Sequence, residues 1–215
     1  MHGLLLGQQN RIKCIVQHGN AFFAWNDAPD IIGALQTTPE RFPMEKPLIH
    51  FAHGKESGPW GSKILALAAI AREMGYDVES LDYSSTFDPA KRVEMLVASC
   101  EKRAPDLLAG SSMGGWVALE TSARLSQIPD QHLKGLFLIA PAIGIPGYPP
   151  FHVGVDGSNI DIVHGWHDSL IPYTNAVTFA HEKRCALHLL DDEHRLKNSI
   201  DRLGQIFRAF LERMR

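Results

Sequence analysis

The strongest chemical pattern in the sequence is a serine set between glycines, in the stretch GSSMGG at residues 110–115. Gly110, Ser112 and Gly114 fit the pattern G-x-S-x-G, with an apolar run before it and a helical pattern after it. A sharp turn from strand to helix strains the central residue and crowds its neighbours two positions away, so small residues are needed there. The pattern predicts that Ser112 is a nucleophile at a helix N-terminus, with the Met113 N–H as one donor to an oxyanion.

Two later loops supply the partners that a serine nucleophile requires. A serine hydroxyl is a weak nucleophile at neutral pH, so it needs a histidine base and an acid that fixes the imidazole tautomer. Asp168 lies in HGWHDSLIP and His194 lies in DDEHRL, and each stretch follows a predicted strand. The carboxyl ends of successive parallel strands meet at one sheet edge, so we predict Ser112 as nucleophile, His194 as base and Asp168 as acid.

Neighbouring residues offer alternatives for two of these roles. Ser111 is the nearest competitor as nucleophile, but it is one residue out of register with Gly114. Asp191 and Asp192 compete with Asp168 as the acid, although adjacent carboxylates at a helix start more often cap the helix. The sequence favours Asp168 without excluding the other two.

The elements that must position these loops follow an alternating order from Pro47 onward. Short apolar runs alternate with segments of helical period, which predicts an α/β fold: a mostly parallel sheet with helices on both faces, as a three-layer sandwich. We predict strands near 48–52, 77–82, 106–110, 135–140, 160–164 and 186–190. We predict helices over 61–74, 89–103, 113–126, 171–183 and 196–213. The Pro- and Gly-rich stretch 141–150 reads as a loop and leaves little room for a lid domain.

The first 43 residues lack this alternation. Two short runs, 12–17 and 21–25, could pair as an N-terminal hairpin. Alternatively, Met44 is the natural start and residues 1–43 are a non-native extension. Both alternatives assign residues 44–215 to the α/β domain.

Composition narrows the class of protein further. The chain has 215 residues, 45% of them hydrophobic, and a formal net charge of −3 without a basic stripe, so a nucleic-acid partner is not expected. Cys14, Cys100 and Cys185 fit neither a disulfide framework nor a metal-ligand spacing, which favours a cytoplasmic setting. The longest apolar run, 64–71, is too short to span a membrane, and no export signal is evident.

Taken together, four stretches resemble the α/β-hydrolase superfamily, in its small bacterial esterase branch without a lid domain. They are GSSMGG, HGWHDSLIP, DDEHRL and HFAHGKESGPWGSK at residues 50–63, and the matches span about residues 47–213. The resemblance implies an eight-stranded core and hydrolysis through an acyl-enzyme. It also implies that the residue after His53-Gly54 supplies the second oxyanion donor, which is the N–H of Lys55.

The expected function is therefore hydrolysis of a small or short-chain ester or thioester, a small-molecule substrate, without a cofactor. His53, Trp60 and Trp166 are candidate substrate contacts, although His53 could instead brace the oxyanion loop and either aromatic ring could simply pack. Eleven histidines invite a metal site, but no H-E-x-x-H, H-x-H or cysteine-histidine spacing occurs, so none is expected. The alternatives are a non-catalytic binding protein of this fold, or a peptidase or carbon–carbon bond hydrolase with the same residues.

Overall fold

The computed structural model describes residues 15–17, 20–22 and 45–215. The chain divides into two compact units, Met1–Pro43 and Met44–Arg215. In the first unit, β1 (Ile15–Gln17) pairs antiparallel with β2 (Asn20–Phe22). The rest of the hairpin predicted over 12–17 and 21–25 lies outside the described residues, and the origin of residues 1–43 stays a prediction.

The second unit is built on a parallel sheet of six strands. They are β3 (Leu48–Ala52), β4 (Asp77–Ser80), β5 (Leu107–Ser111), β6 (Gly135–Ile139), β7 (Ile160–Gly165) and β8 (Ala186–Leu190). Their order is β4-β3-β5-β6-β7-β8, and every neighbouring pair is parallel. The predicted α/β class is confirmed, whereas the eight strands implied by the family resemblance are not reached in residues 45–215.

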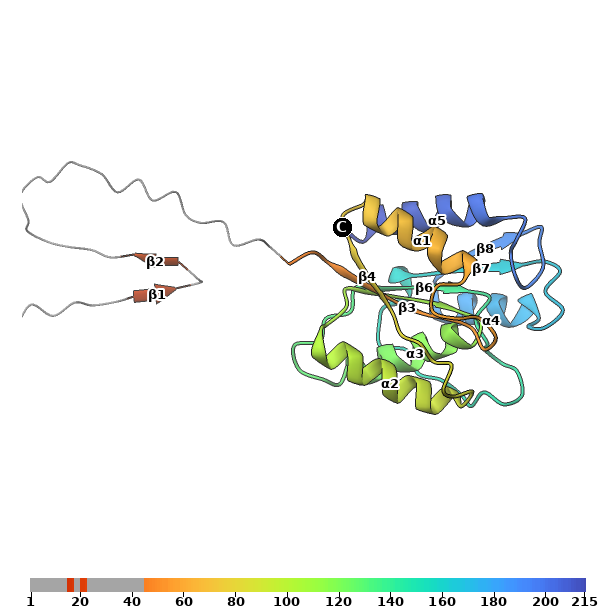
Figure 1. Ribbon diagram of the computed structural model, residues 1–215, viewed down its shortest axis with the longest axis horizontal. Helices are drawn as coiled ribbons and strands as arrows, with labels where there is room; N and C mark the ends of the chain where they lie inside the picture. The colour runs from red at the N-terminus through yellow and green to blue at the C-terminus, as the bar shows by residue number, and fades with distance from the viewer. Residues whose placement is uncertain (1–14, 18–19, 23–44) are drawn as a thin grey trace, which may run out of the picture. The chain divides into compact units, whose positions relative to one another are not determined.

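Helices cover both faces of this sheet, as Figure 1 shows. They are α1 (Ser62–Glu73), α2 (Pro89–Lys102), α3 (Met113–Leu125), α4 (Tyr173–Lys183) and α5 (Ile200–Arg213). α1 and α5 lie on one face, and α2, α3 and α4 lie on the other. None of the helices in the described part of the chain is long and apolar enough to cross a membrane.

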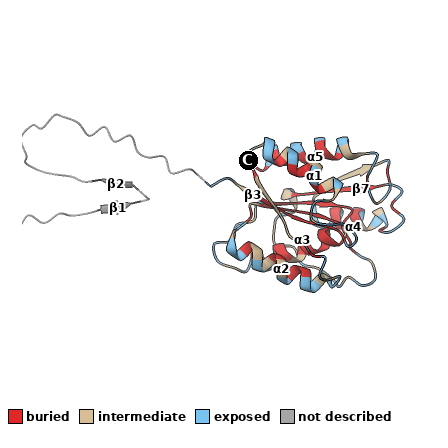
Figure 2. Cartoon of the chain, in the orientation of Figure 1, coloured by how far each residue is buried: buried red, intermediate tan, exposed pale blue. Residues whose placement is uncertain are grey.

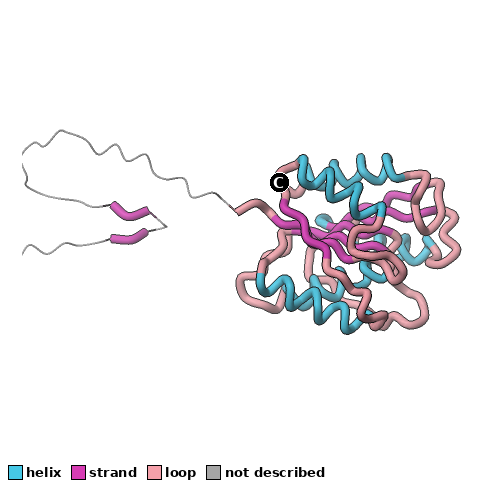
Figure 3. Tube along the Cα trace, viewed as in Figure 1, coloured by secondary structure: helices cyan, strands magenta, loops and turns pink. Residues whose placement is uncertain are grey.

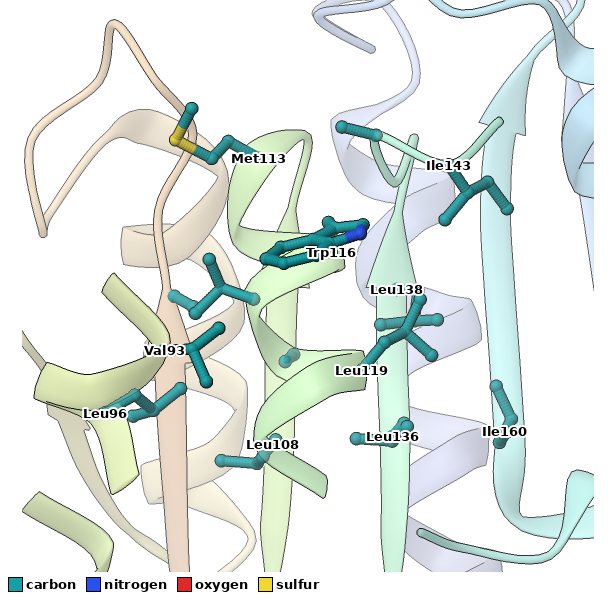
Figure 4. Packing of buried hydrophobic residues seen from close by; sticks show 14 of the residues in the cluster. Val93, Leu96, Leu108, Met113, Trp116, Leu119, Leu136, Leu138, Ile143 and Ile160 are labelled. Carbon is teal, nitrogen blue, oxygen red and sulfur yellow. The ribbon is translucent and has the colours of Figure 1, made fainter. Parts of the chain in front are cut away.

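Each face of the sheet carries its own apolar core. The four inner strands β3, β5, β6 and β7 are buried along their whole length, because helices cover both of their faces (Figure 2). Under α1 and α5, the Phe137 ring packs between Phe207 and Phe210, with centroids 4.8 and 5.4 Å away. On the other face, Leu119 of α3 lies against Leu138 of β6 (Figure 4).

The largest difference from the predicted elements is at the last helix, which begins at Ile200 rather than at residue 196. The preceding residues form a loop because the Asp192 carboxylate accepts the N–H groups of Glu193 and Asn198, at 2.8 and 2.9 Å. Leu196 has a φ of 51°, which ends any helical run there. Between β6 and β7 the only described helix is the 3-10 turn Gly157–Asn159, so the chain has no lid domain there (Figure 3).

Candidate functional site

The turn from β5 into α3 holds Ser112 in a strained backbone conformation. Its φ of 57° and ψ of −119° are rare for a residue with a side chain. Two hydrogen bonds fix the turn: the Ser112 N–H donates to the Ile139 carbonyl at 2.9 Å, and its own carbonyl accepts the Ala142 N–H at 3.0 Å. Strand β6 and the loop after it therefore hold Ser112 in this conformation.

The glycines of the motif are required by close backbone contacts. A Cβ atom on Gly110 would lie 2.2 Å from the Gly114 carbonyl oxygen. A Cβ atom on Gly114 would lie 2.0 Å from the Ala52 carbonyl oxygen at the end of β3. Both distances are far below van der Waals contact with rigid backbone, so the crowding predicted from the sequence is present on both sides of Ser112.

The structure brings together the three side chains predicted from separate loops. The Ser112 Oγ lies 3.1 Å from the His194 Nε2. The other ring nitrogen of His194, Nδ1, lies 2.7 Å from the Asp168 Oδ2. Ser112 follows β5, Asp168 follows β7 and His194 follows β8, so the shared sheet edge explains how residues 82 positions apart meet.

Asp168 is buried, and both of its carboxylate oxygens are occupied. Oδ1 accepts the N–H groups of Leu170 and Ile171 at 2.9 and 2.8 Å, while Oδ2 also contacts the His164 Nε2 at 3.1 Å. Burial alone would raise the pKa of Asp168, but the hydrogen bonds from His164, His194 and Ile171 outweigh it and hold the pKa well below its usual range. Asp168 is therefore an anion that orients the His194 ring.

The competing residues have other partners. Ser111 is buried within the last position of β5, paired with Ile139 of β6. Asp191 is exposed and accepts from His167 at 2.7 Å. Asp192 holds the backbone of the loop that carries His194. None of these three groups contacts the His194 ring in the described part of the chain.

Several backbone N–H groups beside Ser112 have no acceptor among the described residues, and those of Met113 and Lys55 are among them. Met113 is the first residue of α3. Lys55 lies in the loop after β3, residues 53–57, which we call the β3 loop. A Cβ atom on Gly54 would lie 3.4 Å from the Ser112 Cβ, so the β3 loop passes directly beside the serine.

His53, the first residue of the β3 loop, braces the loop through two hydrogen bonds of its ring. Its Nε2 accepts the Tyr83 N–H at 3.1 Å, so the proton resides on Nδ1, which donates to the Gly54 carbonyl at 2.7 Å. Burial lowers the pKa of His53, which favours this neutral form. His53 is not among the residues that line the cavity described below.

Arg92 binds the same loop, although no motif in the sequence marks it as a functional residue. Its side chain is fully buried in α2, and its guanidinium donates to the carbonyl oxygens of His53 and Gly54 at 3.3 and 3.1 Å. It also donates to the carbonyls of Tyr83 and Thr86, at 3.3 and 2.9 Å. In a trans peptide the C=O and N–H groups point in opposite directions, so holding the Gly54 carbonyl fixes the direction of the Lys55 N–H.

A cavity of about 440 Å³ opens over Ser112 and His194. Its lining includes the apolar and aromatic residues Ala142, Ile145, Tyr148, Leu170 and Ile171. Trp60 and Trp166 are absent from the lining: Trp60 stacks beneath the Arg72 guanidinium, and Trp166 packs edge-on against Tyr173. Their predicted contact with substrate gains no support from these positions. In residues 45–215, no three His, Cys, Asp or Glu side chains gather to hold a metal ion.

Solved structures of similar fold were found, whereas no family model and no curated protein matches the sequence. A protein from Xanthomonas campestris pv. campestris, assigned to the α/β superfamily of hydrolases, is 31% identical over 78% of this chain and 99% of its own, with a TM-score of 0.68. Est1E from Butyrivibrio proteoclasticus is 19% identical over 82% and 91%, with a TM-score of 0.65. A lidless α/β serine hydrolase from Xanthomonas campestris is 19% identical over 81% and 85%, with a TM-score of 0.59.

The last two matches concern the fold alone, but the first combines 31% sequence identity with coverage of 78% of this chain. Its 31% identity extends over nearly the full length of the matched chain. Together with the strained serine turn and the order of the loops around it, this similarity identifies the family. The chain belongs to the α/β-hydrolase superfamily.

Proposed function

We propose that the protein is a serine hydrolase that cleaves small or short-chain carboxylic esters or thioesters through an acyl-Ser112 intermediate. One observation carries the proposal: the Ser112 Oγ lies 3.1 Å from the His194 Nε2, while the Asp168 carboxylate lies 2.7 Å from the opposite ring nitrogen. This is the arrangement in which a neutral imidazole removes the serine proton as the oxygen attacks a carbonyl.

In the acylation step, His194 takes the proton from Ser112 while the serine oxygen bonds to the carbonyl carbon. The negative charge that develops on the carbonyl oxygen is stabilised by the N–H groups of Met113 and Lys55, which have no other acceptor among the described residues. Asp168 stabilises the imidazolium without taking its proton. The tetrahedral intermediate then collapses, and His194 protonates the departing alcohol or thiol.

Deacylation repeats these steps with water as the nucleophile. His194 removes a proton from water, the hydroxide attacks the acyl carbon, and the Ser112 oxygen leaves with the proton that His194 returns. The products are a carboxylic acid and the free enzyme. Every proton and electron pair is supplied by these side chains, the substrate or water, so the reaction requires no cofactor.

The size of the cavity and the short connection between β6 and β7 support a small substrate. About 440 Å³ accommodates a short acyl chain and a small alcohol, whereas a long lipid chain would need a larger apolar cover. The proposed partner is a small molecule, and the proposed setting is the cytoplasm. The free thiols at Cys100 and Cys185 are consistent with a cytoplasmic setting.

Covalent labelling tests the nucleophile directly. A fluorophosphonate probe is expected to label the purified protein at Ser112, and Ser112→Ala is expected to lose both labelling and hydrolysis of p-nitrophenyl butyrate. Ser111→Ala is the matched control, because it removes the neighbouring hydroxyl and should retain both. Labelling that persists in Ser112→Ala, or is lost only in Ser111→Ala, would refute the assignment.

A further inference from the structure

The lining of the cavity is rich in positive charge. Its charged residues are Lys55, Lys63, Arg195 and Lys197, with Glu56 as the one carboxylate in the lining. Glu56 lies 3.9 Å from Arg195, where it offsets one of the four cations. We call the four basic residues the cationic wall. Its charge distinguishes this cavity from one suited to a wholly neutral ester.

Lys63 is the member of the cationic wall with the most restricted environment. It is half-buried at the start of α1, and its ammonium has no hydrogen-bonded carboxylate among the described residues. Burial lowers the pKa of Lys63 to about 8; Asp168 partly opposes this decrease, and Arg195 adds to it. A partly desolvated cation without a bonded partner is costly, and an anion placed in the cavity would reduce that cost.

The start of α1 adds to the positive potential at the same place. Gly61, Ser62, Lys63 and Ile64 line the cavity at the helix N-terminus. The cap residue Gly61 offers no side-chain acceptor, and the first turn contains no acidic residue. The partial positive charge of the helix end is therefore not neutralised by a side chain of its own first turn.

The remaining cations extend this field without closing the cavity. The Lys55 ammonium lies 5.8 Å from the centroid of the Phe87 ring, so it is held beside an aromatic face rather than a carboxylate. Lys197 is exposed at the rim. The Asp168 carboxylate contacts the rings of His164 and His194, so its negative charge already has partners other than the cationic wall.

Resting on the hydrolase function proposed above, we propose that the preferred substrate is an ester or thioester carrying a negatively charged group, such as a carboxylate, that binds the cationic wall at Lys63. The reacting carbonyl then lies at Ser112 in the same cavity. The anion belongs either to the acyl chain or to the leaving alcohol, and matched substrates separate these two cases.

Two pairs of esters test the preference. The acyl pair is the p-nitrophenyl half-ester of adipic acid against p-nitrophenyl 6-methylheptanoate, which replaces the carboxylate with an isopropyl group of similar shape. The alcohol pair is the butyryl ester of 4-hydroxybenzoate against that of 4-hydroxybenzamide. In at least one pair, kcat/KM for the anionic ester should exceed that of the neutral ester about tenfold, and salt should reduce the ratio.

Lysine variants test whether Lys63 is responsible for the preference for anionic esters. Lys63→Met should bring the anionic-to-neutral ratio close to one, and Lys63→Arg should keep most of it. Lys91→Met is the matched control, because it removes one positive charge from an exposed position of α2 outside the cavity lining. Equal kcat/KM values for the anionic and the neutral ester in both pairs, measured on the wild type, would overturn the proposal. An anionic-to-neutral ratio that is unchanged in Lys63→Met would also overturn it.

A binding measurement separates this proposal from the hydrolase proposal. In Ser112→Ala the esters should remain intact, so calorimetry can give the Kd of each one. Tighter binding of the anionic ester by about tenfold, lost when Lys63→Met is added, supports the cationic wall even if the wild type hydrolyses neither ester. Equal Kd values for the anionic and neutral esters refute it, whatever the activity of the wild type.

Discussion

The two loops that flank Ser112 are held by buried charges of opposite sign. The β3 loop is fixed by the Arg92 guanidinium, whose hydrogen bonds all end on backbone carbonyl oxygens. The acid loop, residues 165–171, is fixed by the Asp168 carboxylate, which accepts from backbone N–H groups and from histidine rings. Each charge therefore binds backbone groups of opposite polarity: Arg92 binds carbonyl oxygens of the β3 loop and of Tyr83 and Thr86, and Asp168 binds N–H groups of its own loop.

The opposite signs of the two buried charges match the different groups that the two loops would present to a reacting carbonyl. A cation behind the β3 loop turns carbonyl oxygens away from the cavity, which leaves the N–H of Lys55 available for an oxyanion. An anion in the acid loop turns N–H donors toward itself, and it holds the Nδ1 side of the His194 ring so that Nε2 faces Ser112. The sign of the buried charge thus sets the direction of the reactive groups.

Removing the charge of Asp168 in the acid loop should have the largest effect on kcat. Asp168→Asn keeps the shape of the side chain but favours the wrong imidazole tautomer, so kcat for p-nitrophenyl butyrate should fall about 10⁴-fold. Asp191→Asn is the matched control: this carboxylate is exposed and contacts His167 instead, so its kcat should change less than about twofold. A fall of similar size in both variants would show that Asp168 has no special role.

Removing the charge on the β3 side should have a smaller effect on kcat and a distinct kinetic signature. Arg92→Met frees the Gly54–Lys55 peptide to rotate, so kcat should fall about 10- to 100-fold while KM changes little. Arg92 is thus a positioning residue, since it acts through the backbone of the loop. Arg103→Met is the matched control, because Arg103 pairs with Asp77 instead.

A loss of stability in Arg92→Met is also expected, because buried carbonyls would lose their donor. A transition-state analogue separates the two effects. A trifluoromethyl ketone that adds to Ser112 should lose affinity in step with kcat, whereas a variant that is only partly unfolded would bind it normally in its folded fraction. Unchanged affinity for the ketone would mean that Arg92 serves stability alone.

The sequence predicts the parts of this site whose signals are local. The Ser112 turn, Asp168 and His194 were predicted because each lies in a short motif at a strand end, and the parallel fold brings strand ends together. Arg92 was missed because it acts from a helix 38 residues beyond Gly54, and an arginine in an amphipathic helix normally faces solvent. Only its buried position in the folded chain identifies it.

Side-chain direction is the part of the site that the sequence does not predict. The orientation of Lys63 depends on where α1 starts relative to the cavity. Trp60 and Trp166 are candidate substrate contacts by their positions in the loops, and that contact stays a prediction, since each ring lies against a nearby side chain outside the cavity lining. The start of the last helix at Ile200 was also missed, because Asp192 holds the backbone of the preceding loop in a non-helical form.

The smallest expected effect concerns the pH dependence of stability. His164→Phe removes one donor to Asp168, and it also removes the donor to the Ile171 carbonyl, which lies 3.0 Å from the same ring nitrogen. The pKa of Asp168 should therefore rise toward its ordinary value, and the free energy of unfolding near pH 7 should fall by about 1–2 kcal/mol. A carboxyl whose pKa is depressed by folding stabilises the protein above its unfolded pKa of about 4, and this stabilisation is lost as the pH falls.

The unfolded pKa of Asp168 is the same in wild type and His164→Phe, so the stability difference between them depends on the two folded pKa values. The difference should be constant while Asp168 is an anion in both folded proteins, and it should shrink as the pH falls through the folded pKa of Asp168 in His164→Phe, well below the unfolded value of about 4. Urea denaturation from about pH 7 down to about pH 2 measures it. His167→Phe is the matched control, because His167 is exposed and contacts Asp191 rather than Asp168, so its difference should stay small at every pH. A difference for His164→Phe that does not shrink in acid would mean that His164 contributes through packing or through its hydrogen bond with the Ile171 carbonyl, and that the Asp168 anion is held by His194 and the backbone alone.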